Sequence, residues 1–193
     1  MPFFSFNDNA NVNALSKFKT GSYIVSTVVI SIALGIVSLA YTQNIETNPV
    51  NLLYILLSVL YLVVWGTSAF FCGQQRSAWG FLIMWGVMWL PALVYFTAGA
   101  IDPLIIGNDI PFVLGLCYLM AFFTVCPVIA LCVQFASSNL IFAVFTERIE
   151  DNLALLRSGY AEIAIFSAIV FVLLGAVFAF GVYYNKKLAK KGV

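Results

Sequence analysis

Residues that could do chemistry are scarce in this sequence, and the commonest catalytic combinations are missing. The chain contains no histidine, which removes the usual general base and the commonest protein ligand of haem, zinc and copper. It also lacks a glycine-rich phosphate loop and a nucleophile elbow. The apolar segments carry no acidic or basic residue at the depth where proton relays place them. We therefore expect a protein that is not an enzyme and that holds no cofactor or metal.

One polar cluster stands out because it lies within an apolar stretch and follows Pro127. The cluster consists of Gln134, Ser137, Ser138 and Asn139. Polar side chains are costly in hydrocarbon unless they bond to each other or to neighbouring helices. The cluster therefore either lines a solute path beside a broken helix, as in the midplane sites of transporters, or makes polar contacts between packed helices. The sequence leaves both hypotheses open.

The four cysteines lack the short spacing of metal and redox sites. Cys117, Cys126 and Cys132 lie in apolar segments and are predicted to be small core residues. Cys72 lies at the end of an apolar segment and is followed by the polar sequence GQQR. Reversible acylation occurs at such positions next to the membrane surface. Cys72 is therefore a candidate acylation site, with burial in the core as the alternative.

Two lysines near the C-terminus match a short sorting motif. Lys190 and Lys191 occupy the fourth and third positions from the end, which is the arrangement of the dilysine retrieval signal of eukaryotic membrane proteins. A basic tail that only anchors the preceding span has the same composition. In a eukaryotic cell the motif favours the endoplasmic reticulum or another endomembrane. In other cells we expect the plasma or inner membrane.

The composition requires an environment other than water for most of the chain. Of the 193 residues, 63% are hydrophobic and only 9% are charged, whereas a soluble domain carries about 25% charged residues. We therefore predict an all-α, polytopic integral membrane helical bundle. The net charge of +1 is too small to attract nucleic acid, which we exclude as a partner.

The apolar segments define the expected organisation. Each is long enough to cross a hydrocarbon core of about 30 Å, and together they cover residues 21–41, 52–71, 78–98, 111–146 and 161–184. We expect a single transmembrane bundle over residues 21–184. It is preceded by a polar N-terminal tail, residues 1–20, and followed by a basic C-terminal tail, residues 185–193.

The fourth segment is the ambiguous one. A straight helix over residues 111–146 would be about 54 Å long, which exceeds what one crossing needs. Either Pro127 or the polar cluster at residues 134–139 is predicted to break it, so the bundle has five spans, or six if this segment crosses twice. Residues 146–158 mix charged and apolar side chains, which predicts a short amphipathic helix at the membrane surface. Glu162, at the entrance of the last span, is predicted to be a boundary carboxylate.

Basic residues near the ends of spans favour the cytoplasmic side of a membrane. Five crossings would divide the nine basic residues five to four between the two sides. Six crossings would place seven of them on the side of both termini and leave only Arg148 and Arg157 opposite. The charge distribution therefore predicts that both termini are cytoplasmic.

Small residues recur every four positions in two of the segments. They are Thr27, Ser31 and Gly35 in the first, and Gly175 and Ala179 in the last. Such faces let two helices approach closely. We therefore predict a non-catalytic, membrane-organising, assembly or accessory subunit that contacts lipid, other membrane proteins or its own copies. The alternative is a small uncoupled channel or facilitator with its path near residues 134–139.

Overall fold

The computed structural model is almost entirely helical over the described residues, which confirms the predicted all-α bundle. Of the described residues, 96% are helical and none is in a strand. The structure describes residues 8–42, 50–75, 79–107, 112–135, 141, 144 and 153–190.

Five helical segments of the described chain are long and apolar enough to cross a membrane. These segments are Lys19–Thr42, Leu52–Gln74, Trp79–Ile101, Phe112–Phe135 and Leu153–Lys187. The first three lie in α1 (Asp8–Thr42), α2 (Leu52–Gln74) and α3 (Trp79–Ile101). The fourth consists of α5 (Phe112–Val125), the 3₁₀ turn η1 (Cys126–Val128) and α6 (Ile129–Phe135). The fifth lies in α8 (Leu153–Lys190), and a short helix, α4 (Leu104–Gly107), follows α3.

Local signals explain several of these boundaries. The Asn51 side chain accepts a hydrogen bond of 3.2 Å from the N–H of Leu53 and so caps the start of α2. The Asp102 carboxylate does the same for the N–H of Leu104 at 3.0 Å, between α3 and α4. Pro127 lies in η1, so the predicted break in the fourth segment is confirmed as a tight turn between two helices.

Both outer helices extend beyond the apolar segments that the sequence marks. Residues 8–20, which we expected to be a polar tail, are the first turns of α1 because they contain no proline or glycine that would end a helix. Residues 153–158 of the expected amphipathic helix are likewise the first turns of α8, and residues 146–152 lie outside the described part. Residues 185–190 continue α8 at its other end.

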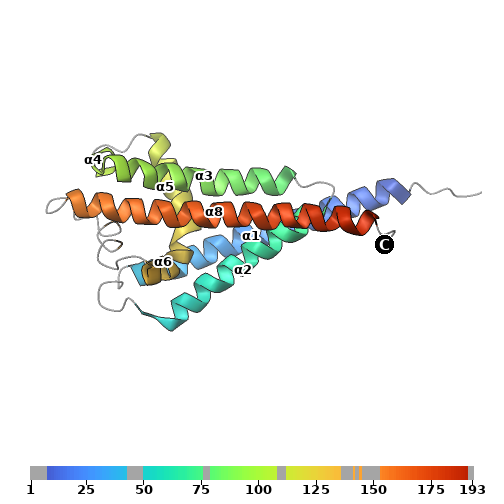
Figure 1. Cartoon of the computed structure of the whole chain (residues 1–193), viewed down its shortest axis with the longest axis horizontal. Helices are drawn as coiled ribbons and strands as arrows, with labels where there is room; N and C mark the ends of the chain where they lie inside the picture. The colour runs from blue at the N-terminus through green and yellow to red at the C-terminus, as the bar shows by residue number, and fades with distance from the viewer. Residues whose placement is uncertain are drawn as a thin grey trace, which may run out of the picture.

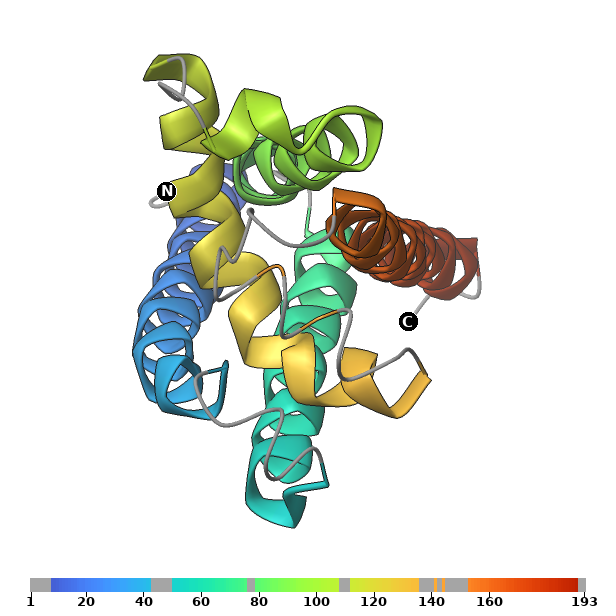
Figure 2. The same ribbon diagram turned by 90° about the vertical axis from the view of Figure 1, so that its left-hand side faces the viewer.

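The helices run in two directions, along the long axis of the molecule and across it. α1, α2, α3 and α8 lie side by side along the long axis of the molecule (Figure 1). α5, η1 and α6 run across them, as both Figure 1 and Figure 2 show. Along this crossing segment, α5 packs on α3 and α1, η1 on α1 and α2, and α6 on α2.

The long helices begin and end at two opposite ends of the bundle. α1 begins and α8 ends at the same end of the bundle, while α3 ends and α8 begins at the opposite end (Figure 1). The chain therefore leaves α3 and enters α8 at one end, and α5, η1 and α6 lie nearer that end. The Asn185 side chain donates a 2.8 Å hydrogen bond to the carbonyl of Gln74, which ties the last turns of α8 to the end of α2.

Large aromatic side chains fill the interior between the long helices. Trp65 of α2 and Trp89 of α3 are fully buried and meet edge to face, with ring centroids 5.9 Å apart. Trp85 of α3 stacks on Phe171 of α8 at 4.1 Å. Such pairs add to the dispersion and burial energy of the core.

Candidate functional site

The small-residue face of α1 lies against α2 and forms a buried hydrogen-bonded cluster. The hydroxyls of Thr27 and Ser68 are 2.6 Å apart, and both residues are buried. The indole N–H of Trp65 donates to the hydroxyl of Ser31 at 3.1 Å. Ser31 in turn donates to the carbonyl of Thr27 at 2.7 Å. These groups satisfy one another across the two helices, so they do not offer polar atoms to a solute.

The break at Pro127 contacts the same two helices, α1 and α2. Because proline has no N–H, the carbonyl of Phe123 cannot accept the usual helical bond from residue 127. The hydroxyl of Tyr61 on α2 donates to this carbonyl at 3.3 Å. On α1, a Cβ atom at Gly35 would lie 3.2 Å from the ring of Phe123. Gly35 therefore gives the crossing segment room to approach α1.

Three buried side-chain polar atoms of the described residues make no hydrogen bond with the described part of the chain. They are Nε1 of Trp85, Nε1 of Trp89 and the hydroxyl oxygen of Ser167. An unpaired buried donor costs on the order of 1–3 kcal/mol. They belong to α3 and α8, and the ring of Trp89 contacts Trp65 of the polar cluster.

The two small residues of the last span lie in different surroundings. Gly175 faces the ring of Trp85, where a Cβ atom would lie 3.1 Å from the nearest ring carbon. Ala179, one turn further, is exposed. The close approach of α8 to α2 involves Gly181. A Cβ atom at Gly181 would collide with the carbonyl of Phe70 on α2.

The structure does not support acylation of Cys72. Its side chain has no exposed surface and packs in the core cluster that includes Trp65. An acylating enzyme could not reach a thiol at this position without local unfolding. Burial in the core, the alternative that the sequence allowed, describes Cys72 in this structure. Lys190 is the last helical residue of α8, and Lys191 lies outside the described residues.

Only one member of the predicted polar path is described. Gln134 is exposed on α6, and its side-chain amide donates to the carbonyl of Ala130 on the same helix at 3.3 Å. The other three members, Ser137, Ser138 and Asn139, lie outside the described residues. Gln134 is not among the described residues that line either of the two cavities described next.

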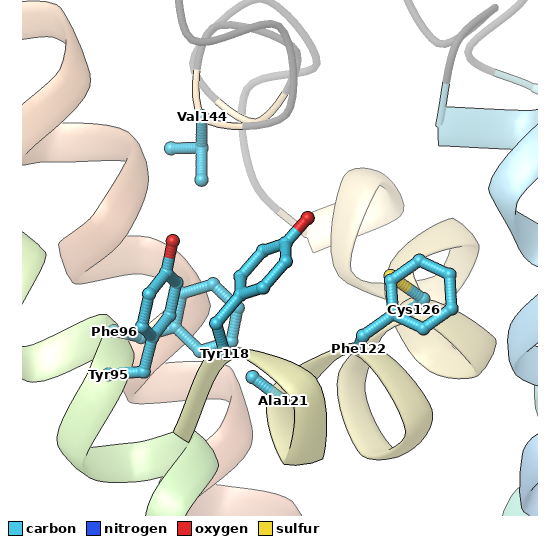
Figure 3. A pocket seen from close by; sticks show the side chains of 7 residues that line it. All are labelled: Tyr95, Phe96, Tyr118, Ala121, Phe122, Cys126 and Val144. Atoms are coloured by element: carbon cyan, nitrogen blue, oxygen red, sulfur yellow. The ribbon is translucent and has the colours of Figure 1, made fainter. Parts of the chain in front are cut away.

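The first cavity is small and aromatic. It has a volume of about 20 Å³ and is lined by Tyr95, Phe96, Tyr118, Ala121, Phe122, Cys126 and Val144. Figure 3 shows the hydroxyls of Tyr95 and Tyr118 pointing toward the side where Val144 lies. This volume holds about one water molecule. None of the described residues that line this cavity is acidic or basic.

The second cavity is a groove between α6 and α8. It has a volume of about 270 Å³ and is lined by Cys132, Phe135, Glu162, Ile165, Phe166 and Ile169. Among the described residues that line it, Glu162 is the charged one, and it is half-buried. Sequence reasoning identified Glu162 as a boundary carboxylate but could not predict the groove. The groove depends on the turn at η1, which brings α6 toward α8, and the apolar pattern does not encode that direction.

Comparison with known proteins gives no match: no protein-family model, curated protein or solved structure matches this chain. Among the described residues, no three His, Cys, Asp or Glu side chains come together as a metal site would require.

Proposed function

We propose that this chain is a non-catalytic multispan membrane protein that acts through contacts with other membrane helices and with lipid. The observation that carries the proposal is the character of its interior. None of the buried residues in the described ranges is charged, and the hydroxyls between α1 and α2 bond to each other. Aromatic rings fill the space that a solute path along the bundle would need.

The arrangement of the helices supports four crossings, with both termini on the same side. α3 ends and α8 begins at one end of the bundle, so the chain between them returns to its starting side. At 1.5 Å per residue, Gly35 lies roughly 10 Å along α1 from Thr42. Tyr61 lies roughly 14 Å along α2 from Leu52. The crossing segment meets both residues, so we place it inside the bilayer, in the half nearer these helix ends.

The charged residues support this topology when they are sorted by the helix end or connection to which they belong. Seven of the nine basic residues belong to the end with both termini: Lys17, Lys19, Arg76, Lys186, Lys187, Lys190 and Lys191. Seven of the eight acidic residues belong to the other end: Glu46, Asp102, Asp109, Glu147, Glu150, Asp151 and Glu162. Because basic residues favour the cytoplasmic side, we assign both termini to the cytoplasm.

The proposal is tested by purifying the full chain in mild detergent, identifying bound proteins and lipids, and measuring flux after reconstitution into liposomes. We expect a stoichiometric membrane-protein partner or a defined self-assembly, bound lipid, and no flux of water, K⁺ or glycerol above that of empty liposomes.

The channel alternative is addressed by replacing Gln134 and Asn139 together by Leu. Flux in the parent protein that this double substitution abolishes, with the helix content unchanged, would establish the channel and overturn the proposal. If the cluster is structural, the same substitution weakens the partner contact or the self-assembly while flux stays at the level of empty liposomes.

A further inference from the structure

The groove between α6 and α8 has a polarity gradient along α8. Ile165, Phe166 and Ile169 come three, four and seven residues after Glu162, so they share one face of the helix with it. The charged residue is at one end of this face, and the apolar residues extend about 10 Å from it. Ile165 and Ile169 are 62% and 54% exposed, so this side of the groove is open to the surroundings of the bundle.

The position of Glu162 along α8 corresponds to the edge of the hydrocarbon core. Residues 163–185 carry no charged side chain and have a helical length of about 34 Å, close to the thickness of that core. Glu162 therefore lies at one surface of the apolar layer. Ile165, Phe166 and Ile169 lie progressively deeper. A membrane lipid has the same order, with its headgroup at the surface and its acyl chain toward the middle.

We propose that this groove binds a membrane lipid with an ammonium headgroup, such as phosphatidylethanolamine, from the leaflet that faces the start of α8. The ammonium group lies at Glu162 because a carboxylate attracts a cation most strongly in surroundings of low dielectric constant. The acyl chain runs along Ile165, Phe166 and Ile169. The inference rests on the membrane placement in the proposed function.

Other occupants fit the groove less well. Divalent cations such as Ca²⁺ take six to eight oxygen ligands, whereas the described lining residues supply one carboxylate, that of Glu162, and the thiol of Cys132. A headgroup that carries negative charge without a cation, such as that of phosphatidylglycerol or a fatty acid, would be repelled by the charge of Glu162. A transmembrane helix of another protein is about 10 Å wide. One wall of the groove is α6, which has only seven residues, so this wall is too short to pack along such a helix.

The test compares lipid retention by the full chain, purified and examined by native mass spectrometry with added phosphatidylethanolamine or phosphatidylglycerol of the same acyl chains. We expect the parent protein to retain phosphatidylethanolamine preferentially. Glu162→Gln keeps the size of the side chain but removes its charge, and we expect it to lower this retention about tenfold. Asp102→Asn, which removes a charge at the same end of the bundle outside the groove, should leave retention unchanged.

Two further measurements keep the result interpretable. Ile169→Trp fills the deep end of the groove and should lower retention even if Glu162→Gln disturbs folding, which circular dichroism would reveal. Free ethanolamine at the same concentration should not displace the lipid, because it has no acyl chain; displacement would indicate a site for soluble amines instead. Equal retention of the two lipids by the parent, or no loss in both variants, would overturn the inference. The proposed function would remain testable by its own flux and co-purification experiments.

Discussion

The hydrogen bond from Tyr61 to the carbonyl of Phe123 stabilises the helix break that Pro127 causes. Pro127 removes the N–H that would normally bond to the carbonyl of Phe123. In hydrocarbon an unpaired carbonyl is costly, and the hydroxyl of Tyr61 supplies a donor from another helix. The turn is therefore stabilised by a contact distant in sequence, which is why its direction is defined.

Replacing Tyr61 by Phe removes this donor and leaves the ring in the core. We expect the free energy of unfolding to fall by about 0.6 kcal/mol, the average for polar contacts between membrane helices, and by no more than about 1.7 kcal/mol, the largest value found for such contacts. Denaturant unfolding in detergent, followed by tryptophan fluorescence, measures it, because Trp65 and Trp89 are buried. Tyr183→Phe is the control, since Tyr183 is 60% exposed. Unfolding of both variants at the parent's denaturant concentration would mean that the bond contributes nothing.

At the scale of helices, α2 and α8 touch through their backbones. A Cβ atom at Gly73 of α2 would meet the carbonyl of Phe178 on α8, and one at Gly181 of α8 would meet the carbonyl of Phe70 on α2. The two glycines therefore face each other's helix at one crossing point. Close approach of this kind strengthens dispersion contacts between helices that lipid alone would not drive together.

Alanine at Gly73 is expected to push α2 and α8 apart, because the obstacle is backbone that cannot rotate away. The free energy of unfolding should fall by about 1–3 kcal/mol, as for other overpacked sites. Gly66→Ala is the matched control in the same helix: a Cβ atom there meets nothing within 4 Å, and alanine favours the helix over glycine by up to about 1 kcal/mol. Thermal unfolding in detergent ranks the two variants. A Gly73→Ala protein as stable as Gly66→Ala would contradict the close contact.

Local patterns in the sequence predict the helices well but predict their directions poorly. The length and apolar character of α2 and α3, and the turn at Pro127, follow from residues that are close in sequence. The face of Thr27 and Ser31 could be identified in the same way, because small polar residues at four-residue spacing lie on one side of a helix. The Gly73 and Gly181 contact was missed because each glycine is isolated in its own segment. The groove beside Glu162 was missed because it needs α6 to lie across the bundle.

For the whole molecule, the crossing segment explains an apolar stretch whose length fits neither one crossing nor two. α5, η1 and α6 together are too apolar to lie in water, and Phe112 and Phe135 are more than 80% exposed at its two ends. The segment nevertheless lies across the long helices. A position inside the bilayer satisfies both observations, because lipid covers the exposed rings while α1, α2 and α3 cover the other side.

Cysteine labelling in membranes tests the resulting four-crossing topology. The native cysteines are at most 8% exposed, so we expect them to contribute little background. A cysteine added after Val193 and one replacing Ser77 should react with an impermeant maleimide only from the cytoplasmic side. Asn44→Cys and Asn152→Cys should react only from the opposite side. Five crossings would instead place the added C-terminal cysteine opposite Ser77→Cys and move Asn152→Cys to the cytoplasmic side.

A cysteine in place of Ser138 separates four crossings from six. If residues 111–146 crossed twice, the turn after Pro127 would face the cytoplasm, and Ser138→Cys would be labelled together with Ser77→Cys. If the segment lies across the bundle, the chain after Phe135 stays on the side where α8 begins, and Ser138→Cys should be labelled together with Asn152→Cys. Labelling after detergent solubilisation shows that the cysteine is reactive at all. Cytoplasmic labelling of Ser138→Cys would therefore overturn the crossing arrangement, while the shared side of the two termini would stand.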